Sequence, residues 1–239
     1  MFEPLLKACQ AAHIEMDVAS SKALADSLDK AGATQQGTNQ TDTDTYLNTL
    51  IRFMATRCMT QAEYFSSGDV AQSQFSHYGL AMPIYTHFTS PIRRYADVVV
   101  HRQLAACIGL EPPSVQLCES ELVTEQCEVL NVRHKNAQWA SRASAELYTL
   151  VFFRGKPSTE EARVVKVREK GVVVFVPKYG IEGTIALAQE DWTKVENAFR
   201  MVSGDGKRAL NLFDRVTVRI EVQQEGQSRQ EHLVLSLVD

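Results

Sequence analysis

The chain has 239 residues, 44% of them hydrophobic, which suffices for one large domain or two smaller ones with buried cores. Its formal net charge of −4 at pH 7 excludes a uniformly basic surface. A signal-like N-terminus and apolar runs near 18 residues are both lacking, which argues against secretion and membrane insertion.

Helical patterning dominates the N-terminal part of the chain. Residues 2–30 predict two short helices, and apolar side chains near helical spacing predict a core-facing helix over residues 46–65. The polar tract between them, residues 35–45, has the composition of a surface linker. Residues 75–88 mix aromatic side chains with glycine and proline, which indicates extended segments leading into the next helix.

Residues 85–102 read Tyr-Thr-His-Phe-Thr-Ser-Pro-Ile-Arg-Arg-Tyr-Ala-Asp-Val-Val-Val-His-Arg. Ser90 as N-cap and Pro91 as first helical residue predict a helix that starts here and ends near Gly109.

Two adjacent arginines, Arg93 and Arg94, then fall in the first turn of this predicted helix. The positive end of the helix dipole disfavours cations there by a few tenths of a kcal/mol unless an anion is present. The Thr89 and Ser90 hydroxyls and the backbone N–H groups would converge on the same point, so the pattern predicts a bound phosphate.

A structural role for these charges is the alternative. Arg93, Asp97 and His101 follow one another at i, i+4 spacing and would share a helix face. Both arginines could simply pair with Asp97 and nearby acids, and we expect Asp97 to orient one of them. General base chemistry by Asp97 and His101 is disfavoured, because no nucleophile sits at workable spacing.

A second long helix is predicted from Glu119 to about Phe153. Trp139 is expected in the core of this region, with stacking on a nucleic-acid base as the alternative.

The composition changes after residue 157, where helical spacing stops and β-branched runs begin, so we expect domains at 1–157 and 158–239. Five strands are predicted, at residues 162–168, 171–176, 180–187, 214–222 and 231–238, with a long irregular connection before the fourth. In the fourth strand, alternation turns Val216, Val218, Ile220 and Val222 inward. The expected fold is α+β, a mostly helical part followed by a five-stranded OB-fold barrel.

The barrel surface carries aromatic side chains flanked by cations, as nucleic-acid binding on such folds requires. The candidates are Lys166, Lys170, Phe175, Lys178 and Tyr179. Strand alternation leaves open whether Phe175 points into the barrel or outward, whereas Tyr179, beside a turn glycine, is expected to be exposed.

Residues 85–102 resemble the signature of the ribonuclease II (RNB) family of 3′-to-5′ exoribonucleases, and residues 48–59 and 77–80 resemble its exosome-associated branch. The last 80 or so residues resemble the OB-fold RNA-binding domain that ends many of these enzymes. The resemblance implies hydrolysis of single-stranded RNA to nucleoside 5′-monophosphates with Mg²⁺, and the exosome complex as a possible partner. It gives Arg93 the catalytic contact with the scissile phosphate. RNA or phosphate binding is expected at Tyr85, His87, Thr89, Ser90 and Arg94, besides the barrel candidates.

The family's metal site is an Asp-x-Asp-Asp cluster upstream of the arginine motif, and no such run occurs in this sequence. Asp42 and Asp44 come nearest, but they lie in the linker-like tract. We therefore expect a C-terminal part of a larger enzyme, inactive alone and without a metal site of its own. Two alternatives stay open, a non-catalytic RNA-binding module or scaffold, and a half-enzyme completed by a partner chain that carries the aspartates.

Five cysteines, an odd number without Cys-x-x-Cys spacing, indicate reduced thiols. With no membrane or secretion signal, the sequence predicts a protein of the nucleus, the cytoplasm or both.

Overall fold

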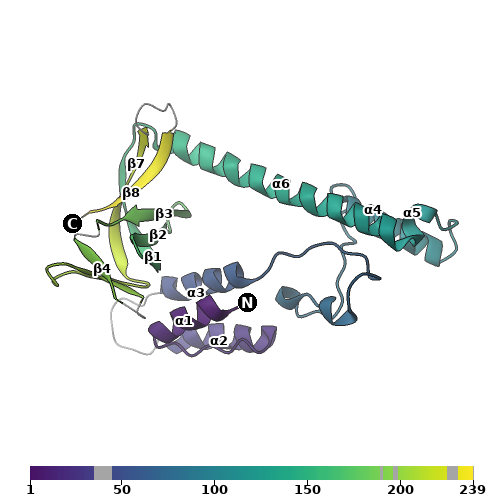
Figure 1. Ribbon diagram of the computed structural model, residues 1–239, viewed down its shortest axis with the longest axis horizontal. Helices are drawn as coiled ribbons and strands as arrows, with labels where there is room; N and C mark the ends of the chain where they lie inside the picture. Colours follow the sequence, from purple (N-terminus) through teal and green to yellow (C-terminus); the bar gives the residue numbers. More distant parts are fainter. Residues whose placement is uncertain (35–44, 189–190, 196–198, 225–230, 239) are drawn as a thin grey trace. The chain divides into compact units, whose positions relative to one another are not determined.

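The computed structural model describes residues 1–34, 45–188, 191–195, 199–224 and 231–238. The chain divides into two compact units. We call Met1–Asp17, Asp26–Cys58 and Ser144–Asp239 the barrel unit, and Val18–Ala25 and Met59–Ala143 the motif unit (Figure 1). Within the described ranges, no helix is both long and apolar enough to cross a membrane.

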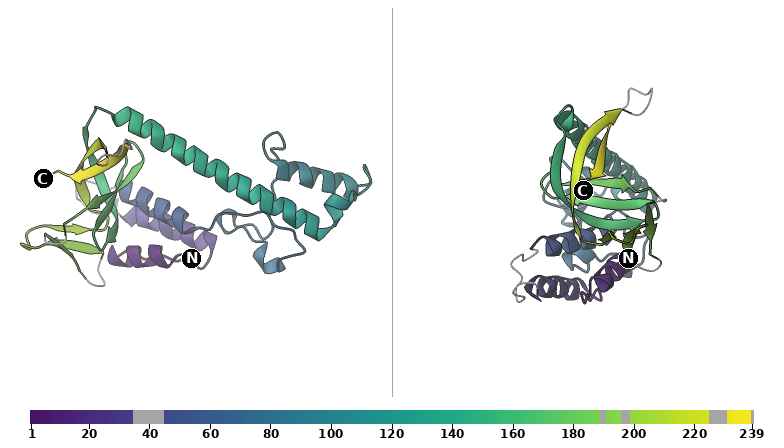
Figure 2. Two further views of the ribbon diagram at one scale, coloured as in Figure 1. Left: turned by 45° about the horizontal axis from the view of Figure 1, so that its top comes forward. Right: turned by 90° about the vertical axis from the view of Figure 1, so that its left-hand side faces the viewer.

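A strongly curved antiparallel sheet forms the centre of the barrel unit (Figure 2). Its order is β3-β2-β1-β7-β8, with bounds Ser158–Arg168 for β1, Gly171–Val176 for β2, Ile181–Ala186 for β3, Arg215–Gln224 for β7 and Glu231–Leu237 for β8. The two edge strands approach closely, because a Cβ atom on Gly183 of β3 would overlap the Leu235 side chain of β8. The sheet is therefore nearly closed, which confirms the predicted five-stranded barrel.

Alternating apolar side chains fill the barrel interior. Val218 and Ile220 are fully buried, and Val216 and Val222 pack against the same cluster, so the predicted inward face of β7 is confirmed. Phe153, at the end of the long helix α6 (Ser120–Phe153), is also buried in this core.

A second, three-stranded sheet occupies the stretch predicted to be irregular. It comprises β4 (Trp192–Lys194), β5 (Arg200–Ser203) and β6 (Ala209–Asn211) in the order β4-β5-β6. The prediction was wrong here because strands of three or four residues are too short to show a clear alternation.

Three helices precede the motif. The bounds are Glu3–Ala11 for α1, Ser21–Thr34 for α2 and Thr45–Cys58 for α3, so the two short helices are confirmed and the third ends earlier than residue 65. On the barrel unit, α3 covers the outer face of β2, where the rings of Phe53 and Tyr46 lie 5.4 and 6.4 Å from that of Phe175. Phe175 thus lies outside the barrel interior but beneath a helix.

The motif unit contains two 3₁₀ turns, η1 (Gln72–Gln74) and η2 (Tyr78–Leu80), followed by α4 (Tyr95–Cys107), α5 (Val115–Cys118) and most of α6. The predicted start of α4 at Pro91 is wrong, because the helix begins at Tyr95. Residues 91–93 form a separate turn in which the backbone N–H groups of Arg93 and Arg94 both donate to the Ser90 carbonyl, at 3.2 and 3.1 Å.

The predicted burial of Trp139 is also wrong, because its side chain is 56% exposed. Val123, Cys127 and Leu130 of α6 line a cavity of about 430 Å³ together with Val99 of α4. Trp139 follows Leu130 by about two and a half helical turns, which places it on the opposite face of α6. The Lys135 ammonium lies 5.3 Å from the centre of its ring.

Candidate functional site

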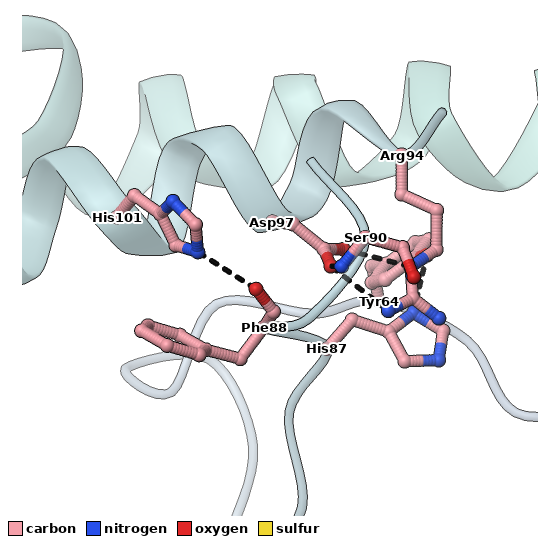
Figure 3. Close-up of polar contacts among 7 residues, drawn as sticks. All are labelled: Tyr64, His87, Phe88, Ser90, Arg94, Asp97 and His101. Atoms are coloured by element: carbon pink, nitrogen blue, oxygen red, sulfur yellow. Dashed lines mark hydrogen bonds and ion pairs between the residues drawn. The ribbon is translucent and has the colours of Figure 1, made fainter. Parts of the chain in front are cut away.

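The buried Asp97 and the half-buried Arg94 form a clamp at the start of α4 (Figure 3). Arg94 Nε donates to Asp97 Oδ1 at 2.9 Å and Arg94 Nη2 to Asp97 Oδ2 at 2.8 Å, while the Ser90 backbone N–H donates to Oδ2 at 2.7 Å. The hydrogen bonds from Arg94 hold the pKa of Asp97 below its usual range, and Asp97 raises the pKa of Arg94. The expectation that Asp97 orients an arginine is met by Arg94.

This clamp explains why the local helix-start signal fails. Asp97 accepts the Ser90 N–H from inside the first turn of α4, so the chain from Ser90 to Arg94 closes a turn before the helix begins. Arg93 therefore precedes the helix, and its predicted place at position N3 of the first turn is wrong.

The two arginines differ in what they can do. Arg94 is committed to Asp97, whereas Arg93 is exposed, and no hydrogen bond or ion pair of its side chain occurs within the described part of the chain. Its neighbour Ile92 is 96% exposed, so this turn projects into solvent. Of these two arginines, Arg93 is thus the one that is open to an anionic ligand.

A row of rings leads to this turn. The ring centres of His77 and Tyr85 lie 5.2 Å apart, those of Tyr85 and His87 5.7 Å, and those of His87 and Tyr64 5.5 Å, each pair edge to face. Tyr85 is 45% exposed, and the other three are half-buried. The sequence predicts Tyr85 and His87 as binding residues, but not His77 and Tyr64.

Tyr64 is anchored from a distant helix. Its backbone N–H donates to Asn131 Oδ1 and its carbonyl accepts from Asn131 Nδ2, both at 2.8 Å, and its hydroxyl lies 2.7 Å from His87 Nδ1. Burial raises the pKa of Tyr64. No local spacing could have revealed this residue, because Asn131 is 67 positions away in the sequence.

The remaining motif residues are placed by backbone contacts. His101 Nε2 lies 2.7 Å from the Phe88 carbonyl oxygen, and their rings are 4.4 Å apart, so His101 holds the segment before the turn (Figure 3). Thr89 is exposed, and Ser90 is half-buried with its N–H committed to Asp97.

The barrel candidates do not form one cluster. Lys166 and Lys170 are exposed near the β1–β2 hairpin, whereas Lys178 and Tyr179 lie in the β2–β3 turn at the other end of β2. Lys178 Nζ and Tyr179 Oη both donate to Glu160 Oε1, at 2.7 and 3.0 Å. The bond from Lys178 has the largest effect in lowering the pKa of Glu160, and the bond from Tyr179 lowers it further.

Tyr179 is half-buried rather than exposed, since its ring packs 5.1 Å from that of Phe153. Phe175 lies beneath α3, as described above. Lys166 and Lys170 are therefore the barrel candidates that stand open to a ligand, because no bond from either ammonium group is found among the described residues.

The described residues do not fit a metal site. Within them, no three histidine, cysteine or acidic side chains gather where they could hold an ion. Asp42 and Asp44 lie outside the described residues.

Two family models match the chain. Residues 3–109 match the RNB domain, and residues 158–235 match an S1 domain. Over 228 residues, 93% of the chain, it is 50% identical to exosome complex exonuclease RRP44 homolog A of Arabidopsis thaliana. Over 100% of the chain, it is 42% identical to human exosome complex exonuclease RRP44. In both cases the chain spans 24% of the relative's length.

Solved structures show the same architecture. RNase R of Mycoplasma genitalium, in complex with ribose-methylated single-stranded RNA, matches 99% of this chain and 36% of its own with a TM-score of 0.76 at 16% identity. Yeast Ssd1, described as a pseudonuclease, matches 93% of this chain and 25% of its own with a TM-score of 0.62 at 27% identity. The predicted α+β fold, a helical part followed by an OB-type barrel, is confirmed.

Proposed function

Because this chain belongs to the RNB family, we propose that it is the C-terminal part of a 3′-to-5′ exoribonuclease that hydrolyses single-stranded RNA to nucleoside 5′-monophosphates. The observation that carries this proposal is the difference in side-chain contacts between two adjacent arginines. Arg94 is fixed by the buried Asp97, and Arg93 is presented to solvent on the turn that this clamp closes. The names of the relatives, exosome complex exonucleases, support the reaction class.

Arg93 is proposed to contact the scissile phosphate. A guanidinium beside a reacting phosphoryl group stabilises the negative charge that accumulates in the transition state. Its loss should reduce turnover by about 10²- to 10³-fold, as for other single donors of this kind. Thr89, Ser90, Tyr85 and His87 would line the RNA path next to it.

Mg²⁺, which the family resemblance implies, is proposed to act in the longer enzyme. Since the described residues offer no site for it, no step of the reaction is assigned to a metal ion held by this chain. Arg93 would contribute its positive charge, and the Arg94–Asp97 clamp would hold the turn that carries Arg93.

The barrel is proposed to bind the RNA backbone through Lys166 and Lys170. Phe175, Lys178 and Tyr179 could join them only by giving up their contacts with α3, Glu160 or Phe153. We propose association with an exosome complex because the relatives are named as exosome complex exonucleases. These names and the five free cysteines also lead us to propose residence in the nucleus, the cytoplasm or both.

A salt titration tests the binding part of the proposal. The chain's affinity for a single-stranded RNA should fall with salt concentration, and Lys166→Ala and Lys170→Ala should each reduce the logarithmic slope by about 0.7, the value for one single-strand phosphate contact. Lys7→Ala is the matched control, because Lys7 is exposed on α1 and paired with Glu3. Unchanged slopes in both barrel variants would show that the barrel does not bind RNA through these lysines.

A non-catalytic RNA-binding module is the second candidate. The likeness to Ssd1, a pseudonuclease, favours it, because that protein keeps this architecture at 27% identity. RNA retention by the longer protein without any shortening of the RNA would support this candidate over the enzyme.

A further inference from the structure

The imidazole ring of His87 is held at one nitrogen by the Tyr64 hydroxyl, 2.7 Å from Nδ1. We propose that Tyr64 fixes His87 as a hydrogen-bond donor whose Nε2–H binds a backbone phosphate of single-stranded RNA beside Arg93. Tyr64 is then a positioning residue and His87 a phosphate ligand. This inference rests on the proposed function, since it names the group of the RNA that the site recognises.

The proposed direction of the hydrogen bond, from the Tyr64 hydroxyl to Nδ1, is one that both partners allow. Burial raises the pKa of Tyr64, so its hydroxyl keeps its proton at neutral pH and can donate it to Nδ1. When Nδ1 of a neutral imidazole accepts, the ring proton is on Nε2. In the proposed arrangement, Tyr64 selects the tautomer that carries a donor on the second nitrogen.

The surroundings of His87 keep the ring neutral. Burial lowers its pKa first, and the charge of Arg94, followed by smaller effects of His134 and Arg93, lowers it further. Asp97 opposes these effects but is itself paired with Arg94. The donor at Nε2 is thus supplied without a third positive charge beside two arginines.

The position of the ring is set from outside the motif. Tyr64 is bonded through both its backbone groups to Asn131 of α6, and Figure 3 shows His87, Arg94 and Asp97 gathered at the start of α4. No bond from His87 Nε2 to another residue is found in the described ranges. Because two arginines lie within electrostatic reach of this ring, a phosphate oxygen is the acceptor that best fits the donor.

Nitrogen NMR of the 239-residue chain tests the tautomer directly. In protein labelled with ¹⁵N at histidine, we expect a protonated Nε2 and an unprotonated Nδ1 for His87 at neutral pH. Tyr64→Phe removes the donor, and the Nδ1 resonance should move toward the protonated form as the second tautomer becomes populated. A protonated Nδ1 in the unmodified chain would mean that Tyr64 accepts instead, and would overturn the proposal.

Paired substitutions at His87 test the phosphate contact. His87→Gln keeps an amide donor near the position of Nε2, whereas His87→Asn places its amide near Nδ1. For a short single-stranded RNA, the dissociation constant should rise about tenfold in His87→Asn, as expected for one hydrogen bond to a charged group, and less than about threefold in His87→Gln. Equal losses in the two variants, or none, would contradict the proposed donor.

A DNA strand of the same sequence identifies the acceptor. The loss in His87→Asn should be the same for DNA and RNA, because both have phosphates. A loss confined to RNA would show that His87 contacts a 2′-hydroxyl, and the phosphate assignment would be wrong. If the unmodified chain binds no RNA at all, the proposed function fails together with this inference. If it binds RNA and His87→Asn binds equally well, the inference alone fails.

Discussion

Separate alanine substitutions of Arg93 and Arg94 should have different consequences, although the residues are neighbours. Arg93 is exposed on a turn, so Arg93→Ala should change the free energy of unfolding by no more than about 0.5 kcal/mol. In the longer enzyme the same change should lower turnover by about 10²- to 10³-fold, or about 2.7–4 kcal/mol of transition-state stabilisation. RNA affinity should be largely kept.

Arg94→Ala should damage the fold as well as the reaction. The buried carboxylate of Asp97 accepts three hydrogen bonds, and two of them come from Arg94. Their loss leaves a buried charge with one donor and loosens the turn that presents Arg93, so the melting temperature should fall by roughly 5 °C or more. Arg94→Lys should recover only part of this, because an ammonium cannot reproduce the bidentate geometry.

Thermal unfolding of the chain and single-turnover kinetics of the longer enzyme, measured on the same three variants, check this reasoning. Equal destabilisation by Arg93→Ala and Arg94→Ala would show that Arg93 also has a structural partner. Normal turnover in Arg93→Ala would refute its catalytic role.

Three further predictions concern stability. Gly171→Ala should lower the free energy of unfolding by about 3 kcal/mol, because φ is 150° and a Cβ would overlap the Ile185 carbonyl oxygen. Gly180→Ala has a φ of 67° but open space around the new Cβ, so it should lower the free energy of unfolding by only about 1 kcal/mol. Equal losses in denaturant titrations of the two variants would contradict the overlap at Gly171. Phe175→Ala should lower the free energy of unfolding by about 2 kcal/mol, less than the roughly 3–5 kcal/mol of a fully buried phenylalanine, because Phe175 is half-buried beneath α3. Unchanged unfolding in urea would mean that the packing of α3 does not depend on this ring. The lowered pKa of Asp97 gives stability that is complete above pH of about 4 and is lost as pH falls through the folded-state pKa. The melting temperature of Asp97→Asn should therefore depend less on pH in the acid range than that of the unmodified chain. Identical pH dependence would show that this carboxylate is not the group that titrates.

The barrel strands could be predicted because their side chains alternate. The bounds of β2 match residues 171–176, and the inward face of β7 follows from its valines and isoleucine. The small β4-β5-β6 sheet could not be predicted, because each strand has too few residues to establish a period. The covering of Phe175 also depends on α3, which lies more than a hundred positions earlier in the chain.

The site illustrates how tertiary contacts override local signals. Ser90 and Pro91 have the composition of a helix start, yet the Asp97 carboxylate takes the Ser90 N–H and moves the start of the helix to Tyr95. The family resemblance points to Arg93, whereas composition and spacing do not distinguish it from Arg94; the hydrogen bonds of Arg94 with Asp97 do. Tyr64 could not be predicted from the sequence, because its position depends on Asn131 and on the ring of His87.

The proposed function makes this chain an RNA-binding part of an RNA exonuclease that does not shorten RNA alone. The most direct test incubates the purified chain, unmodified and as Arg93→Ala, with 5′-end-labelled single-stranded RNA in the presence and absence of Mg²⁺, and reads native and denaturing gels. We expect retention of the RNA on the native gel without shortening on the denaturing gel. A ladder that shortens from the 3′ end with Mg²⁺ and disappears in Arg93→Ala would support Arg93 but contradict the view that the metal site lies outside this chain. Failure to retain RNA under any condition would contradict the proposed RNA binding by this chain.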